Sequence, residues 1–126
     1  MAEPLRNIHP EVAKLRQELI DVRRHFHKHP EMGYKEFETA AYVAKYLTDL
    51  GMEVSTEIGI TGVVGLLKGG ADDSDSPCIA LRADMDGLPL LEETGLDFAS
   101  VNEGVMHACG HDGHMAILLI AAKVLR

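Results

Sequence analysis

The residues of this chain best suited to chemistry lie within eight positions, from His107 to His114. This segment contains three histidines, one cysteine, one aspartate and two glycines. Thiolate, imidazole and carboxylate groups are the usual protein ligands of zinc and related divalent metals. The glycines let the backbone turn tightly enough for these side chains to converge. The segment therefore predicts a metal site, and we expect Cys109 and His111, which flank a glycine beside an expected helix start, to be ligands.

Two other interpretations of Cys109 stay open. Cysteine is among the most buried residue types, so an isolated cysteine is typically an inert thiol. A cysteine can also act as a nucleophile when a histidine serves as its base. Thiol proteases usually take that histidine from a distant part of the chain, whereas here three histidines lie within five positions of the thiol. The local pattern thus favours a ligand over a nucleophile.

A helix is expected directly behind this segment. The run from Met115 to Ala122 is apolar on every side, which predicts a buried helix whose N-terminal end faces residues 107–114. Two further helices, over residues 10–27 and 35–50, are predicted by apolar residues at steps of three and four. We expect the second of these to end at Gly51.

The first predicted helix ends in a group of histidines before Pro30, a residue that stops helices. Cationic side chains in a last helical turn complement the negative end of the helix dipole. We expect this role, rather than metal binding, for the three residues His25, His27 and His29.

Three strands are predicted after the helices. Alternation over residues 52–58 predicts a half-buried strand, and the apolar run 63–67 predicts an interior one. The third, residues 78–86, carries Asp84 and Asp86 on its polar face near its C-terminal end, the edge at which open α/β sheets bind ligands. A carboxylate there can orient a histidine ligand or bind the metal itself. A merely solvated strand face is the alternative.

The remaining segments are predicted to be irregular. Residues 69–77 are small, polar and acidic, which is typical of a solvated turn. Residues 90–105 form a loop before the metal-ligand segment. Glu92 and Glu93 lie in that loop without a constraint that would make either one a general base, so we assign them no role.

Composition limits the possible functions. The chain has 126 residues, which suits a single modest domain, and its net charge of −8 argues against nucleic-acid binding. The longest apolar run is eight residues, too short to span a membrane. The first residues are too polar for a secretion signal, so we expect a cytoplasmic protein. Two cysteines do not make a disulfide framework.

Three motifs in order resemble the N-terminal part of a family of metal-dependent amidohydrolases. That family includes hippurate hydrolase, N-acyl-amino-acid hydrolases and auxin-conjugate hydrolases, which are relatives of zinc aminopeptidases and carboxypeptidases. The motifs are Arg23-Arg24 with His27 to Glu31, then Ala80 to Pro89, then Met106 to His114.

The resemblance implies a three-layer, zinc-exopeptidase-like α/β catalytic domain with a mixed sheet, of which residues 1–126 would be only the N-terminal part. It implies two divalent ions (zinc, manganese, cobalt or nickel) and an N-acyl amino acid or short peptide as substrate. By motif position Cys109 and His111 fall on metal ligands, and Asp84 falls on a carboxylate that supports the catalytic site. His107, Asp112 and His114 match the motif without an implied role.

In this family the general base and the remaining ligands follow further along the chain than Arg126. The resemblance therefore implies that residues 1–126 alone are inactive, and that the complete protein is a homo-oligomer acting on a small molecule. A non-catalytic metal-binding fragment or regulatory module is the alternative.

Overall fold

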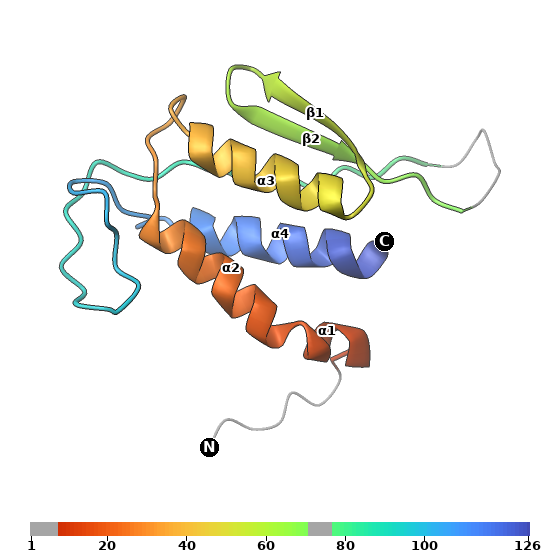
Figure 1. Ribbon diagram of the computed structural model, residues 1–126, viewed down its shortest axis with the longest axis horizontal. Coiled ribbons are helices and arrows are strands. Elements are labelled where there is room, and N and C mark those ends of the chain that lie inside the picture. Colours follow the sequence, from red (N-terminus) through yellow and green to blue (C-terminus); the bar gives the residue numbers. More distant parts are fainter. Residues whose placement is uncertain (1–7, 71–76) are drawn as a thin grey trace.

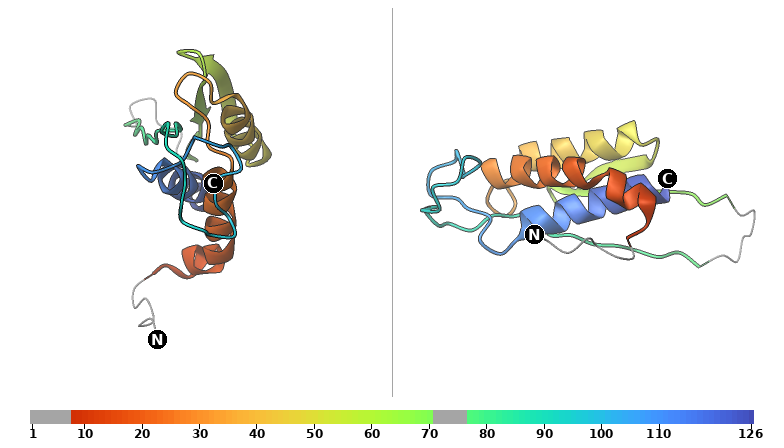
Figure 2. Two further views of the ribbon diagram at one scale, coloured as in Figure 1. Left: turned by 90° about the vertical axis from the view of Figure 1, so that its left-hand side faces the viewer. Right: turned by 90° about the horizontal axis from the view of Figure 1, so that it is seen from below.

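The computed structural model describes residues 8–70 and 77–126 of the chain (Figure 1). Most of the predicted turn 69–77 lies outside these residues. The element order is α1, α2, α3, β1, β2 and α4. Figure 1 shows α3 between the β1–β2 hairpin and α4, and Figure 2 shows α2 running beside α4. No helix in the described residues is long and apolar enough to cross a membrane.

The first predicted helix is present but divided. Helix α1 spans Pro10–Lys14 and α2 spans Arg16–Lys28, with Leu15 between them at φ −90° and ψ 4°. Val22 and Phe26 of α2 are buried in the core, as the periodicity predicts. The helix ends at Lys28, with His29 as its C-cap directly before Pro30, which confirms the predicted stop.

Helix α3 spans Phe37–Asp49 and begins two residues later than predicted. Its start is held by Glu31, whose carboxylate accepts hydrogen bonds from the backbone N–H groups of Glu38 and Thr39. Unpaired N–H groups in a first helical turn are commonly satisfied in this way. The periodicity places Phe37 on the core side, but it is 61% exposed, because it lies on the first turn beyond the packed face. Gly51, at φ +79°, follows the helix end as predicted.

The two strands form an antiparallel hairpin. Strand β1 spans Glu53–Ile58 and β2 spans Gly62–Leu66, with an irregularity in register between Ser55 and Ile58. The prediction of an interior strand at 63–67 is wrong, since Val64 is 52% exposed and Leu66 is 44% exposed. An apolar strand is covered only where other elements pack on both faces, and within the described residues β2 pairs with β1 alone.

Residues 78–86 do not form the predicted regular strand. They are extended, but within the described residues no ladder pairs them with a neighbour. Single bridges follow instead, Met32 with Gly87 and Leu88 with Met106. Only part of the predicted apolar face is covered: Ala83 and Met85 pack against the core, whereas Ile79 is 82% exposed. The implied mixed sheet is therefore not assembled within the described residues, and the structure is that of a partial α/β domain.

Helix α4, His111–Leu125, is the central element of the core. Its buried side contacts α2 and α3 through Met115, Ala116 and Leu119, which are at most 3% exposed. The predicted helix is thus confirmed, with a start four residues earlier. Ile117 and Leu125 are more than 60% exposed, so the other elements cover only part of this apolar helix. Because its sequence is apolar on every side, burial on all sides is predicted. Within the described residues, however, other elements cover it on one side only.

Candidate metal centre

His111 is the first residue of α4 and is held by Asp86. Its Nδ1 lies 3.0 Å from the Asp86 carboxylate Oδ1 and 3.0 Å from the Asp86 carbonyl oxygen. Both partners are acceptors, so Nδ1 carries the proton and donates. In the neutral ring Nε2 is then the unprotonated nitrogen, the form in which imidazole binds metals.

Close backbone approach brings Asp86 to His111. The bridges of Gly87 to Met32 and of Leu88 to Met106 place the end of the 78–86 segment beside the start of the metal-ligand segment. A side chain at Gly87 would be tightly packed, because its Cβ would lie 3.1 Å from Pro30 Cβ and 3.1 Å from Val105 Cγ1. Glycine at this position therefore allows the close approach without displacing its neighbours.

Asp84 lies on the same side of the extended segment but farther from the imidazole. Its Oδ2 is 3.8 Å from Nε2 of His111, and its Oδ1 pairs with Arg82 at 2.7 Å. The motif match gives the supporting role to Asp84 and no role to Asp86. The two-residue spacing correctly predicts that both carboxylates share one face. The direct hydrogen bond, however, is made by Asp86.

Cys109 is exposed in the turn before α4, next to Gly110 at φ +79°. Across residues 8–70 and 77–126, no group of three or more histidine, cysteine, aspartate or glutamate side chains converges in a way that could hold a metal ion. The structure thus places Cys109 and His111 two residues apart at the helix start without a third converging ligand. Their role as ligands stays a prediction.

A buried network behind the first turn of α4 was not predicted. Asp112 is fully buried, and its Oδ2 accepts hydrogen bonds from Arg23 Nε at 2.9 Å and His27 Nδ1 at 2.8 Å. The other ring nitrogen of His27 lies 2.9 Å from Glu92 Oε1. Ionised carboxylates only accept hydrogen bonds, so each ring nitrogen of His27 faces a carboxylate acceptor. His27 lies in the last turn of α2, as predicted, but it is also 4% exposed and bridges two acids, which was not predicted from the sequence.

Glu92 anchors the loop that precedes the metal-ligand segment. Its side chain is 2% exposed and accepts hydrogen bonds from Thr94 Oγ1 at 2.5 Å and from the Ser100 N–H at 2.7 Å. Burial acts to raise the pKa of Glu92, but the hydrogen bonds from Thr94, Ser100 and His27 outweigh it and lower that pKa to about 2. Glu92 is therefore an ionised structural anchor at neutral pH.

His107 is a second buried imidazole near this network. It is 3% exposed, and neither ring nitrogen has a hydrogen-bond partner within the described residues; the same holds for Asp112 Oδ1. Burial lowers the pKa of His107, which keeps the ring neutral. Buried polar atoms without partners are rare in proteins, so these three atoms distinguish His107 and Asp112 from ordinary core residues.

The fold is that of part of an α/β domain of the kind found in an M20 peptidase of known structure. Residues 80–126 match the family described as peptidase family M20/M25/M40. The chain is thus related in sequence and fold to this family, which confirms the resemblance carried by its three motifs.

Individual relatives support the same relationship. The chain is 52% identical to a hippurate hydrolase of Campylobacter jejuni, over 94% of this chain and 30% of that protein. It is 46% identical to an N-acetyl-L-cysteine deacetylase of Bacillus subtilis, over 91% of this chain and 27% of that protein. A crystal structure of a dinuclear metal-binding M20 peptidase from Bacillus subtilis superposes with a TM-score of 0.81 at 40% identity, over 90% of this chain and 31% of that one. The chain therefore spans about 30% of the length of these relatives.

Proposed function

We propose that this chain is the N-terminal portion of the catalytic domain of a metal-dependent amidohydrolase that cleaves the amide bond of N-acyl amino acids or short peptides. The observation that carries the proposal is the His111–Asp86 pair, because it presents Nε2 of a helix-start histidine as a metal-binding nitrogen. The names of the relatives, which include a hippurate hydrolase and a deacetylase, supply the substrate class.

The side chains at this site have the chemical character of divalent-metal ligands. Cys109 and His111 offer a thiolate and an imidazole, the pair that favours a borderline-soft ion such as zinc, and Asp84 lies 3.8 Å from the His111 ring. By analogy with the dinuclear peptidase, two ions are proposed for the complete site. Bound metal would polarise the amide carbonyl and lower the pKa of a water molecule.

The protein's own groups prepare the site for that chemistry. Asp86 fixes the tautomer and the ring orientation of His111. The hydrogen bonds that Asp112 accepts from Arg23 and His27 fix the first turn of α4, and with it the position of His111. The general base and further ligands are proposed to come from the part of the domain beyond these residues, so the 126-residue chain alone should not turn over substrate. The complete enzyme is proposed to be a cytoplasmic homo-oligomer.

The decisive experiment measures bound metal and hydrolysis of a hippurate-type substrate in a longer protein that carries this segment. Cys109→Ala and His111→Ala should each lower the metal stoichiometry and abolish turnover. Cys78→Ala is the matched control, because Cys78 is also an exposed free cysteine. Unchanged metal content in both ligand variants would refute the assignment. Metal binding without turnover in the longer protein would favour a non-catalytic metal-binding module.

A further inference from the structure

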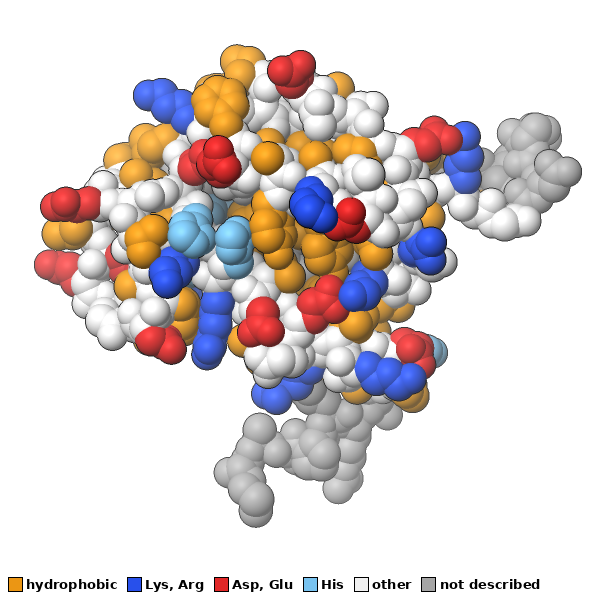
Figure 3. Space-filling view, in the orientation of Figure 1, with side chains coloured by type: hydrophobic (Ala, Val, Ile, Leu, Met, Phe, Trp, Pro, Cys, Tyr) orange, Lys and Arg blue, Asp and Glu red, His pale blue; other side chains and the backbone are white. Residues whose placement is uncertain are grey.

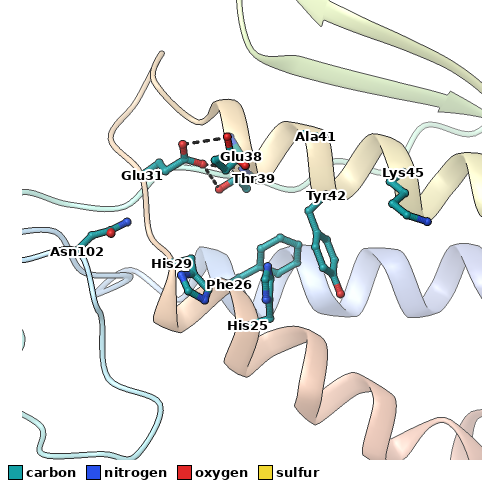
Figure 4. Close-up of a pocket in the computed structure, with 10 residues that line it drawn as sticks. All are labelled: His25, Phe26, His29, Glu31, Glu38, Thr39, Ala41, Tyr42, Lys45 and Asn102. Carbon is teal, nitrogen blue, oxygen red and sulfur yellow. Dashed lines mark hydrogen bonds between the residues drawn. The ribbon is translucent and has the colours of Figure 1, made fainter.

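His25 of α2 and His29, the C-cap of that helix, form a histidine pair on the side that faces α3. The ring centroids of His25 and His29 are 4.9 Å apart, and Figure 4 shows the two rings next to each other at the end of the helix. Zinc–nitrogen bonds are about 2.0–2.1 Å long, so two imidazoles on one tetrahedral ion have centroids about 5 Å apart. The observed spacing therefore already matches that of a chelating pair.

The ring nitrogens of this pair are available. Within the described residues, no hydrogen bond engages a ring nitrogen of His25 or His29, whereas both nitrogens of His27 are occupied. Both side chains are exposed. Partial burial of the ring lowers the pKa of His25, with a further contribution from the neighbouring His29, and this favours the neutral ring. Neutral imidazole is the form that binds metals.

The surrounding structure holds the ring of His25 and the backbone of His29 in place. His25 stacks on Tyr42 with centroids 4.4 Å apart and planes 22° apart. The N–H of His29 donates to the carbonyl oxygens of His25 and Phe26, which keeps its backbone on the last helical turn. The next residue, Pro30, is fully buried and its carbonyl accepts a hydrogen bond from Asn102. Such support reduces the entropy lost when a ligand is bound.

The environment suits a hydrated cation. The pair lines a groove of about 510 Å³, which leaves room for an ion with its remaining water ligands. Glu31 and Glu38 also line the groove, together with one cation, Lys45. His25 lies in the last turn of α2 and His29 directly follows the helix, where the helix dipole favours positive charge. Figure 3 shows histidine side chains grouped beside apolar ones on this open face of the molecule.

In place of the helix-end role expected from the sequence, we propose that His25 and His29 form a divalent transition-metal site of their own at the end of α2, outside the 107–114 segment, which takes zinc, nickel or copper through two imidazoles and completes its coordination with water. The site uses the four-residue spacing by which histidines on one helix face bind zinc. It is independent of the hydrolase proposal, because it uses neither Cys109 nor His111.

The test titrates the 126-residue chain with Ni²⁺, Zn²⁺ or Cu²⁺ alone, in a Cys109→Ala/His111→Ala background that removes the other candidate site. One equivalent should bind, and His25→Ala or His29→Ala should each weaken binding at least tenfold, since a single imidazole remains. With Cu²⁺, electron paramagnetic resonance should detect two coupled imidazole nitrogens in the background protein and one in each variant.

His9→Ala is the control, because it removes an exposed histidine at the far end of the helical segment, and helical circular dichroism checks the fold of every variant. The proposal is overturned if His25→Ala and His29→Ala bind as tightly as the background protein. It is equally overturned if His9→Ala weakens binding to the same extent.

Discussion

Nδ1 of His111 lies 3.0 Å from Oδ1 of Asp86, and this contact determines which nitrogen of His111 can bind a metal. A histidine that donates a hydrogen bond from Nδ1 to a carboxylate leaves Nε2 free to bind a metal. The negative charge of the carboxylate makes Nε2 a stronger metal ligand. Asp84 is 3.8 Å from the same Nε2, so it lies on the side where an ion would be bound.

Asp86→Asn and Asp84→Asn should therefore have different effects in a longer, metal-binding version of the protein. Asp86→Asn should weaken metal affinity by about 10-fold to 100-fold, because the neutral amide lacks the negative charge that strengthens metal binding through Nε2 of His111. Asp84→Asn should lower turnover while the fold survives. Metal titrations and steady-state rates measure the two effects. A fully active Asp84→Asn would contradict the supporting role that the motif predicts for Asp84.

Asp112→Ala should destabilise the chain by about 3–5 kcal/mol, because it removes one partner of a buried charge network and leaves His27 beside Glu92 alone. Urea unfolding followed by circular dichroism measures the change. Asp49→Ala removes an exposed aspartate paired with Lys45 and should change the stability little. Similar stabilities for the two variants would show that the network does not hold α4 in place.

Stability should fall as the pH drops from about 4.5 toward 2, because the pKa of Glu92 is held at about 2 in the folded state against an ordinary value of 4.5. A lowered pKa stabilises the fold above the unfolded-state value, and this contribution is lost as the pH falls through the folded-state value. Urea midpoints measured between about pH 7 and about pH 2.5 follow this loss. Glu92→Gln should flatten the profile, whereas Glu93→Gln, a change at the exposed neighbour, should leave it intact. Equal profiles for both variants would assign the acid sensitivity to other groups.

Gly87→Ala and Gly113→Ala should shift stability in opposite directions. The new methyl at position 87 would lie 3.1 Å from Pro30 Cβ and 3.3 Å from the Met106 carbonyl oxygen, and such overpacking costs about 1–3 kcal/mol. Gly113 lies inside α4, and a Cβ there would meet nothing within 4 Å, so alanine should stabilise the helix by about 0.5–1 kcal/mol. Thermal unfolding of both variants checks the signs. If Gly87→Ala left the stability unchanged, the 84–88 segment could move away from Met106 without loss of stability.

Helices and the chemistry-bearing segment could be predicted from the sequence because their signals are local. The three- and four-residue periodicity marks the helices near residues 16–28 and 37–49, and the apolar run after His114 marks α4. The histidines and the cysteine of residues 107–114 indicate metal binding because they lie close together in the sequence. Burial of strands was less predictable: β2 is apolar on both faces, yet it is exposed because burial depends on which elements pack against it.

The sequence alone is enough to infer an apolar C-terminal helix that follows a segment rich in thiol and imidazole groups. It also contains motifs that resemble those of the metal-dependent amidohydrolases. The partners of those groups are set by the folded chain instead. His27 is 85 residues from Asp112 and 65 residues from Glu92 in the chain, and no periodicity relates them. Likewise, the choice of Asp86 over Asp84 as the hydrogen-bond partner of His111 depends on the close approach at Gly87. Local propensity sets the backbone of each element, whereas side-chain pairing depends on how distant elements pack.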